Sequence, residues 1–130
     1  MKISTKGRYA LKIMIDLGIN SSGEYISLKD IATRQGISIK YLEQIIAILN
    51  KAGFVKSARG NSGGYKLSKK PEEYRVGDIL RVAEGDLAPT NCMKEDCGRR
   101  ADCITFSFWQ GLDMVIEEYV DSKTLNDLIS

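Results

Sequence analysis

Histidine is absent from this chain. Its absence removes the side chain that most often acts as a general base, and it excludes the zinc sites that use imidazole ligands. The sequence also offers no nucleophile–base pair and no glycine-rich dinucleotide fingerprint. We therefore predict that the protein is not an enzyme.

Long hydrophobic runs are also lacking. No window approaches the roughly 20 apolar residues that a membrane-spanning helix needs, and no apolar stretch of signal-peptide length follows the first lysines. We expect a cytoplasmic protein without a membrane partner. With 43% hydrophobic and 28% charged residues, the composition is typical of one globular domain. The only prolines, Pro71 and Pro89, are predicted to mark boundaries between elements.

Cysteine is scarce, and all of it lies in one short segment as Cys92, Cys97 and Cys103. An odd number of cysteines in a reducing compartment argues against a disulfide framework and favours metal or redox chemistry. Thiolates are the ligands that iron–sulfur clusters prefer, so we predict such a cluster. Zinc, reactive thiols without metal and spare structural thiols remain alternatives. Three thiolates leave one ligand position, for which the local candidates are Glu95, Asp96, Asp102, water or a small thiol.

Charge is divided unevenly along the chain. Residues 1–70 contain 13 Lys or Arg and four Asp or Glu, which gives +9, whereas residues 71–130 contain six and 13, which gives −7. A basic half joined to an acidic half is typical of a nucleic-acid-binding region attached to a region with another task.

Hydrophobic periodicity and turn residues predict a mainly α fold with one small β-hairpin. A helix, a second helix that stops at a glycine, a third helix and then a hairpin form the order of a winged helix-turn-helix. A long C-terminal helix is expected to form a dimer interface. We expect a DNA-binding region over 1–70, a connecting helix and cysteine loop over 71–103, and a dimerisation helix with a final turn over 104–130, all in one compact domain. The predicted helices are 6–20, 28–36, 39–52, 77–84, 104–120 and 125–129, and the predicted strands are 54–58 and 64–68.

The third predicted helix carries the side chains expected to read DNA. Ser38 and Tyr41 can bond phosphate, while Lys40 and Gln44 can address acceptors on guanine or adenine. Glu43 is a carboxylate that phosphates would repel. Its presence on this face makes sense if it accepts a hydrogen bond from cytosine N4 or rejects wrong sites.

The glycine-rich turn of the predicted hairpin is the candidate wing. It is not a phosphate-binding P-loop, because the chain after it runs into a strand and not into a helix. Arg59 and Gly60 lie at its tip, with Lys56 and Lys66 on its flanks. An arginine in this position can contact phosphates or enter a narrow minor groove.

Six short motifs follow one another along the chain: Lys6–Ala10, Ile37–Gln44, Lys51–Gly53, Val55–Gly60, Gly63–Tyr65 and Val82–Gly85. In their order and spacing they resemble the Rrf2 superfamily of bacterial transcription regulators. The resemblance covers nearly the whole chain and implies a homodimer built on the long C-terminal helix, bound to a near-palindromic operator in double-stranded DNA. It also implies that Glu43 sets specificity and that Arg59 and Gly60 make wing contacts.

The cysteine trio resembles the iron–sulfur branch of this superfamily, which includes IscR, NsrR and RirA. This implies an iron–sulfur cluster held by Cys92, Cys97 and Cys103, of 2Fe–2S type in preference to 4Fe–4S. The chain departs from the branch in its fourth ligand. Phe106 stands where the cluster-biogenesis regulator has a histidine, and Arg8 aligns where other members use an acidic residue of the partner subunit.

An incomplete protein ligand set would make the cluster labile, which suits a sensor. We therefore expect a repressor or activator whose operator affinity depends on the cluster. The alternative is a cluster-free winged-helix repressor controlled by a protein partner or by thiol oxidation.

Overall fold

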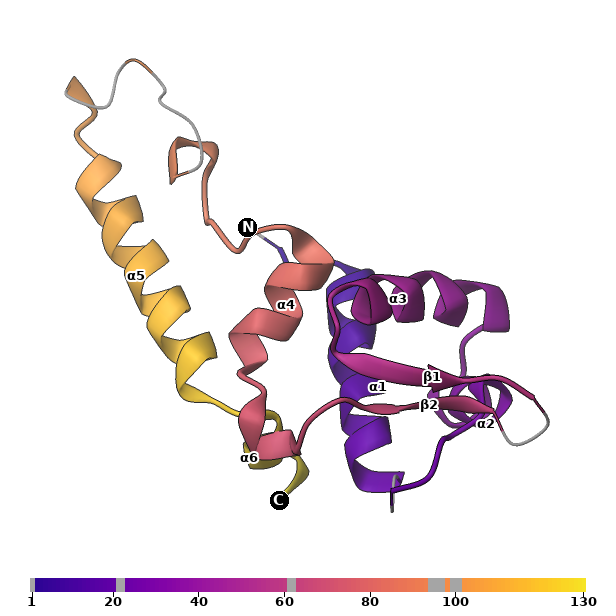
Figure 1. The fold of residues 1–130 in the computed structure, drawn as a ribbon. Helices are drawn as coiled ribbons and strands as arrows, with labels where there is room; N and C mark the ends of the chain where they lie inside the picture. Colours follow the sequence, from indigo (N-terminus) through magenta and orange to yellow (C-terminus); the bar gives the residue numbers. More distant parts are fainter. Residues whose placement is uncertain (1, 21–22, 61–62, 94–97, 99–101) are drawn as a thin grey trace.

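The computed structural model of the chain describes residues 2–20, 23–60, 63–93, 98 and 102–130. Within these ranges the fold is mainly α with one two-stranded antiparallel hairpin, as the sequence predicts (Figure 1). Two short 3₁₀ segments precede α4 and α5. The elements are α1 (Thr5–Asn20), α2 (Leu28–Gln35), α3 (Ile39–Lys51), β1 (Val55–Ala58), β2 (Gly64–Leu67), η1 (Pro71–Glu73), α4 (Val76–Glu84), η2 (Asn91–Met93), α5 (Phe106–Ser122) and α6 (Leu125–Ile129).

Both helices of the helix-turn-helix pair begin at the residues that the capping pattern predicts. The Ser27 hydroxyl accepts a hydrogen bond from the Asp30 N–H at the start of α2, and the Ser38 hydroxyl accepts one from the Tyr41 N–H at the start of α3, each at 3.1 Å. Each bond satisfies a backbone donor that a helix N-terminus leaves unpaired. Gly36, at φ 65°, ends α2 and turns the chain toward α3.

The hydrophobic core lies between α1 and the helix-turn-helix pair. Apolar residues at helical spacing on α1 and α3 meet there, and they are joined by side chains from β1, α4 and α6. A helix buried along one stripe is stabilised mainly by this packing and not by its intrinsic propensity. The fully buried large side chains are Ile13, Met14, Leu17, Ile31, Leu42, Ile45, Ile46, Leu49, Ile79 and Leu125.

A buried ion pair also fixes α2 against α1. Asp16, only 4% exposed, accepts hydrogen bonds from Arg34 Nη2 at 2.7 Å, Arg34 Nε at 3.0 Å and Gln35 Nε2 at 2.9 Å. Burial alone would raise the pKa of Asp16, but the hydrogen bonds from Arg34 and Gln35 outweigh it and hold this pKa below its usual value. The second helix therefore has a defined position on the first.

The wing hairpin is attached to the core at both of its ends. Near the turn, Ile26 and Tyr65 exchange two backbone hydrogen bonds of 2.8 Å each. At the open end, the buried Tyr74 hydroxyl donates to the Phe54 carbonyl at 2.6 Å and accepts from the Ser68 N–H at 3.0 Å. These contacts orient the hairpin relative to α3.

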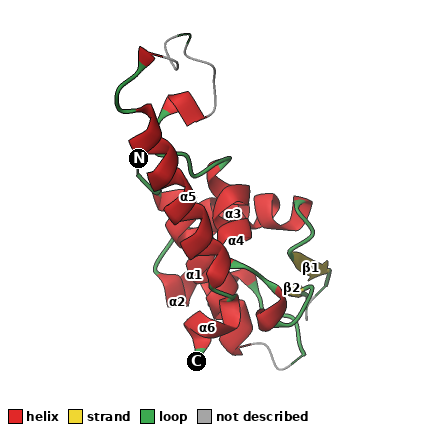
Figure 2. Cartoon of the chain, turned by 90° about the vertical axis from the view of Figure 1, so that its left-hand side faces the viewer, coloured by secondary structure: helices red, strands yellow, loops and turns green. Residues whose placement is uncertain are grey.

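The long helix α5 stands on the far side of α4 from the helix-turn-helix pair and runs alongside α4 (Figures 1 and 2). Arg81 of α4 holds it through a bidentate pair with Asp121 at 2.9 Å and a further contact with Glu117. The two helices come close at Gly77, where an added Cβ would lie 2.2 Å from Asp121 Oδ1. Glycine at this position therefore permits the approach of α5.

The last helix packs against α1. Leu125 of α6 is fully buried in the main core. Arg75, just before α4, and Thr124, just before α6, form an antiparallel bridge. Within the described residues, no helix has the length and apolar character that crossing a membrane requires.

Candidate DNA-binding surface and cysteine loop

The exposed face of α3 presents the polar residues that the sequence predicts. Ser38, Lys40, Glu43 and Gln44 are all exposed, and the opposite face of the helix is buried in the core. The Ser38 hydroxyl is occupied as an acceptor by the helix cap, so it remains able to donate its proton to a phosphate oxygen. The arrangement can therefore offer donors to phosphates and both donors and an acceptor to base edges.

Tyr41 differs from its neighbours because it is half-buried. Its ring packs edge-on against Tyr9 of α1, with centroids 6.0 Å apart, and the Lys12 amino group lies 4.9 Å from the Tyr9 ring centroid. This contact anchors the first turn of α3 to α1. A hydroxyl held in this way has a restricted position, which suits contact with a phosphate more than adaptive reading of a base.

Ile39 is a residue of this face that the sequence reasoning missed. It is 47% exposed in the first turn of α3, between Ser38 and Lys40. An exposed apolar side chain there can contact a thymine methyl group. The sequence signal was its position directly after the helix cap, at the edge of the buried stripe.

The wing tip carries Arg59 and Gly60, both exposed. Gly60 has φ 100°, and its carbonyl accepts a hydrogen bond from the Gly63 N–H at 3.0 Å across the turn. Among the described residues, no carboxylate pairs with Arg59. Its guanidinium is therefore available to an external anion.

The cysteine segment connects α4 to α5, and its described parts lie at the end of the molecule away from α6 (Figure 1). Cys92 is half-buried in η2, with its sulfur 2.8 Å from the Thr90 hydroxyl. Cys103 is exposed just before α5, and its sulfur lies 3.5 Å from the Thr105 hydroxyl. That hydrogen bond, with support from the backbone of Thr105 and Phe106, lowers the pKa of the Cys103 thiol and favours the thiolate.

Several residues expected at a metal site lie outside the described part of the chain: Cys97, Glu95 and Asp96. Within the described part, no group of three metal-binding side chains gathers, and Cys103 is a free thiol. Asp102 is exposed beside Cys103.

A second missed feature connects the cysteine segment to the DNA-binding region. Glu84, the last residue of α4, accepts hydrogen bonds from the N–H and the hydroxyl of Ser4, at 2.8 and 2.6 Å. Ser4 directly precedes α1. The start of the cysteine segment is thus tied to the first helix of the DNA-binding region, a contact between residues 80 positions apart that no local pattern indicates.

Three features of this chain are those of winged-helix DNA-binding proteins. They are the helix-turn-helix pair, the hairpin wing with Arg59 at its tip, and the basic N-terminal half. Comparison with known proteins then identifies the family. The family described as "Rrf2: Iron-dependent Transcriptional regulator" matches residues 3–130. The chain belongs to the Rrf2 family of transcription regulators.

Individual relatives agree with this assignment over the full length. A putative HTH-type transcriptional regulator of Haemophilus influenzae is 40% identical over 131 residues, which cover 100% of this chain and 87% of that protein. The structure of CymR (YrzC), the global cysteine regulator of B. subtilis, matches with a TM-score of 0.82 and 42% identity, covering 99% of this chain and 96% of that one. The structure of IscR from T. potens matches with a TM-score of 0.80 and 45% identity, covering 99% and 86%.

Proposed function

We propose that this protein is a homodimeric, sequence-specific transcription regulator whose affinity for a double-stranded DNA operator depends on an iron–sulfur cluster. The observation that carries the proposal is the position of the cysteines. They lie on the segment that connects α4, which packs on the DNA-binding core, to α5, which presents an exposed apolar face. A regulator of this kind would act in the cytoplasm.

DNA would be read by α3 and the wing together. Ser38 and Tyr41 would position the protein on phosphates, while Lys40, Glu43 and Gln44 would contact base edges. Arg59 and Gly60 would contact the backbone or the minor groove beside the site. The net charge of +9 in residues 1–70 supports this assignment, because positive charge attracts the phosphates of DNA.

The donor set fits an iron–sulfur cluster. Cys103 is a free thiol, and its lowered pKa favours the thiolate form that ligates iron. Cys92 lies in η2, on the same segment between α4 and α5. With Cys97 they would supply three thiolates and hold a cluster of 2Fe–2S type in preference to 4Fe–4S. Asp102 is a described candidate for the remaining position, and water or a small thiol would serve equally.

Two contacts offer a route from the cysteine segment to the DNA-binding region. Glu84 binds Ser4 at the start of α1, and Arg81 holds α5 through Glu117 and Asp121. A change in the loop between α4 and α5 would act on both contacts. Binding of the cluster would alter operator affinity only if the protein has two states that differ in operator affinity and also hold the cluster with different affinities.

Dimerisation would use the exposed face of α5. Phe108, Val115 and Tyr119 are 61–64% exposed, and they recur at spacings of seven and four residues, on one side of the helix. Val115 and Tyr119 also line an apolar groove of about 320 Å³ together with Leu80 of α4. A second copy of α5 would cover this face, because large apolar patches on a monomer mark interaction sites.

A cluster-free regulator is the second candidate. The structural neighbour described as a global cysteine regulator supports it, and a free Cys103 with a lowered pKa suits control by thiol oxidation. This version keeps the same DNA surface and the same dimer but needs no metal.

Anoxic purification followed by iron and acid-labile sulfide analysis separates the two candidates. We expect a coloured protein with stoichiometric iron and sulfide, and we expect Cys92→Ser, Cys97→Ser and Cys103→Ser each to purify colourless, folded and dimeric. Their operator affinity should match that of chemically stripped wild-type protein. Thr105→Ser, which keeps the hydroxyl beside Cys103, serves as the matched control and should retain the cluster.

The results that contradict the cluster are specific. Colourless wild-type protein without iron, whose operator affinity still responds to a thiol oxidant, would support the cluster-free regulator. Full iron content in one Cys→Ser variant would remove that cysteine from the ligand set. Wild-type DNA binding in all three variants, with and without oxygen, would leave the cysteines without a regulatory role.

A further inference from the structure

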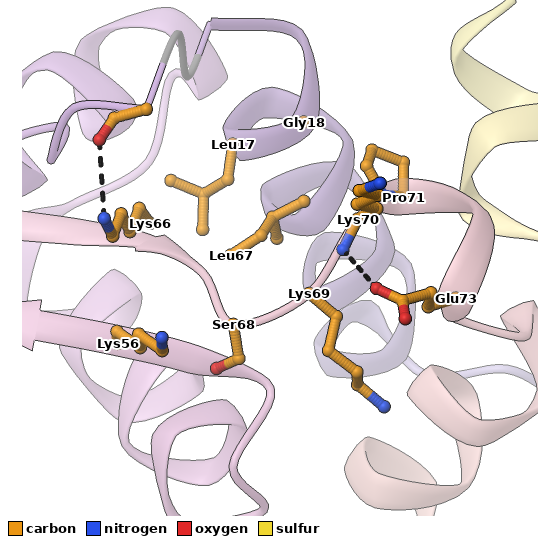
Figure 3. Close-up of a pocket in the computed structure, with 11 residues that line it drawn as sticks. Leu17, Gly18, Lys56, Lys66, Leu67, Ser68, Lys69, Lys70, Pro71 and Glu73 are labelled. Carbon is orange, nitrogen blue, oxygen red and sulfur yellow. Dashed lines mark hydrogen bonds between the residues drawn. The ribbon is translucent and has the colours of Figure 1, made fainter.

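A hollow of about 500 Å³ lies at the base of the wing, between the C-terminal end of α1 and the segment that joins β2 to η1 (Figure 3). Its apolar part is formed by Leu17 of α1, Leu67 at the end of β2 and Pro71 of η1. In Figure 3 the side chains of Leu17 and Leu67 lie between Lys66 on one side and Lys70 on the other. The hollow thus combines an apolar floor with a cationic rim.

Four lysines line this hollow: Lys56, Lys66, Lys69 and Lys70. Among the residues that the structure describes, none of their amino groups forms a salt bridge with a carboxylate. Glu73 also lines the hollow, and its carboxylate accepts the Lys70 backbone N–H at 2.8 Å. Lys69 turns its amino group toward the Tyr74 ring, 5.1 Å from the centroid. Lys56 and Lys66 are the two of these lysines that the paired strands of the hairpin contribute.

The pairing of the hairpin places these two lysines directly opposite each other. Lys56 of β1 and Lys66 of β2 are register partners, so both side chains stand on the same face of the hairpin. Like charges directly opposite on a strand pair are destabilising. Lys66 is half-buried, and the partners of its amino group among the described residues are the Gly23 carbonyl at 3.4 Å and the Tyr25 ring at 4.7 Å. An anion between the two lysines would offset the repulsion between them and would give the half-buried Lys66 charge a partner of opposite sign.

We propose that this hollow binds a small organic anion that carries a phosphate or carboxylate group and an apolar portion. The anionic group would lie between Lys56 and Lys66, and the apolar portion would rest on Leu17 and Leu67. This site is separate from the cysteine segment and is independent of the function proposed above.

The position of the hollow favours a small molecule over a DNA phosphate. The pair Val55 and Leu67 marks the open end of the hairpin, whereas Ala58 and Gly64 mark the end that carries Arg59 and Gly60. Contact of the wing tip with DNA would therefore use the opposite end of the hairpin. A bound anion would instead change the charge on the strands that support the tip.

Phenyl phosphate is a suitable probe, because it joins a dianion to an apolar ring. We would titrate it into the ¹⁵N-labelled full-length protein at constant ionic strength and follow amide shifts by NMR. We expect saturable shifts centred on Leu67, Ser68 and Lys69. Lys56→Gln and Lys66→Gln should each weaken binding about tenfold, the factor expected for the loss of one charge-assisted hydrogen bond.

Lys29→Gln and Lys51→Gln are the matched controls, because both lysines are exposed on helices outside the hollow. They should leave the affinity unchanged, and the amide spectrum of each variant would verify its fold. Equal weakening in all four variants would overturn the site in favour of general charge screening. Identical shifts with benzyl alcohol would overturn the requirement for an anion. Displacement of phenyl phosphate by operator DNA, together with loss of DNA affinity in Lys56→Gln and Lys66→Gln, would assign the hollow to a DNA phosphate and overturn the small-molecule site.

Discussion

Glu43 is a carboxylate on the exposed face of α3, within a half of the chain that carries a net charge of +9. Next to DNA, such a group is repelled by every phosphate and gains only where it can accept a hydrogen bond. Its contribution to binding would therefore depend on the base that it faces. Arg59 is the opposite case, because attraction of a guanidinium to phosphate carries no sequence information.

Replacing Glu43 with Ala should relax sequence preference more than it lowers affinity, because the change deletes both a cytosine contact and a repulsion. Discrimination at one base pair should fall by about 1–3 kcal/mol. Binding-site selection with wild type and variant measures this effect. Glu72→Ala, an exposed carboxylate on η1, is the control and should keep the wild-type preference. An unaltered preference in Glu43→Ala would make Glu43 an ordinary surface residue.

Replacing Arg59 with Ala should weaken binding to operator and unrelated DNA alike. If the contact is to phosphate, the slope of log affinity against log salt should fall by about one. Titrations of fluorescent duplexes at several salt concentrations give this slope. Arg75→Ala removes an arginine that pairs with Asp78 on the other half of the chain and should leave the slope as it is. Unchanged operator affinity in Arg59→Ala would remove the wing assignment. A loss that varies with flanking A·T content would indicate a minor-groove contact in its place.

At the scale of elements, the angle between α1 and α2 depends on Asp16. Its carboxylate is buried and accepts hydrogen bonds from both Arg34 and Gln35 at the end of α2. Removing the charge would leave Arg34 without its partner, although Arg34 can still reach water because its side chain is 39% exposed. The expected cost is therefore below that of a fully buried pair.

Replacing Asp16 with Asn should lower the free energy of unfolding by about 1–3 kcal/mol near neutral pH. The pKa of Asp16 is lowered on folding, so its stabilising contribution is complete above the usual carboxyl pKa of about 4 and is lost as the pH falls through the folded-state pKa. The difference between wild type and variant should therefore be constant at neutral pH and shrink below about pH 4. Urea denaturation across this range tests it.

Asp113→Asn on α5 is the control for this series and should change stability little at any pH. A difference in unfolding free energy between wild type and Asp16→Asn that persists undiminished at low pH would show that the effect comes from altered packing and not from the lost charge.

The elements themselves were predictable from local signals. Ser27 and Ser38 cap their helices, Gly36 and Gly53 stand at the ends of α2 and α3, and the apolar stripe of α3 is buried as its spacing requires. Boundaries differ by one or two residues where a terminal turn tightens or frays. The predicted start of the long helix at 104 is one such case, since α5 begins at Phe106.

The contacts between elements were not predictable in the same way. Asp16 and Arg34 lie 18 residues apart, and Arg81 and Asp121 lie 40 apart. Nothing in their spacing distinguishes these residues from solvated surface charges. Only the packing of α1 on α2 and of α4 on α5 brings them together. The candidate DNA-binding residues were accessible to sequence reasoning because they share one helix and one turn.

At the scale of the whole molecule, the exposed apolar side of α5 sets the expected oligomeric state. None of the described residues of α5 is buried, yet the helix is 17 residues long and carries Phe108, Val115 and Tyr119 on one side. A helix of this kind gains stability when its apolar side is covered. A second copy of the chain can supply the same side in return, which is the condition for a two-fold symmetric interface.

Replacing Val115 with Asp should shift the protein from dimer to monomer, because a buried, unpaired carboxylate costs about 2 kcal/mol or more, which weakens association at least about 30-fold. Sedimentation equilibrium of both proteins measures the change. Gln110→Asp places the same charge on a different side of α5 and should leave the dimer intact. A wild-type protein that sediments as a monomer at every concentration would contradict the dimer itself.

The bridge between Arg75 and Thr124 has an evolutionary consequence. Arg75, just before α4, and Thr124, just after α5, lie side by side, and Ile79 of α4 and Leu125 of α6 are both buried in the main core. We therefore expect insertions or deletions in the loop between α4 and α5 to leave α3 and the wing in place. Cysteines could be gained, lost or respaced in this loop while the exposed residues of α3 and the wing stay the same. On the function proposed above, the signal that the protein senses could then change without a change in the DNA sequence that it binds.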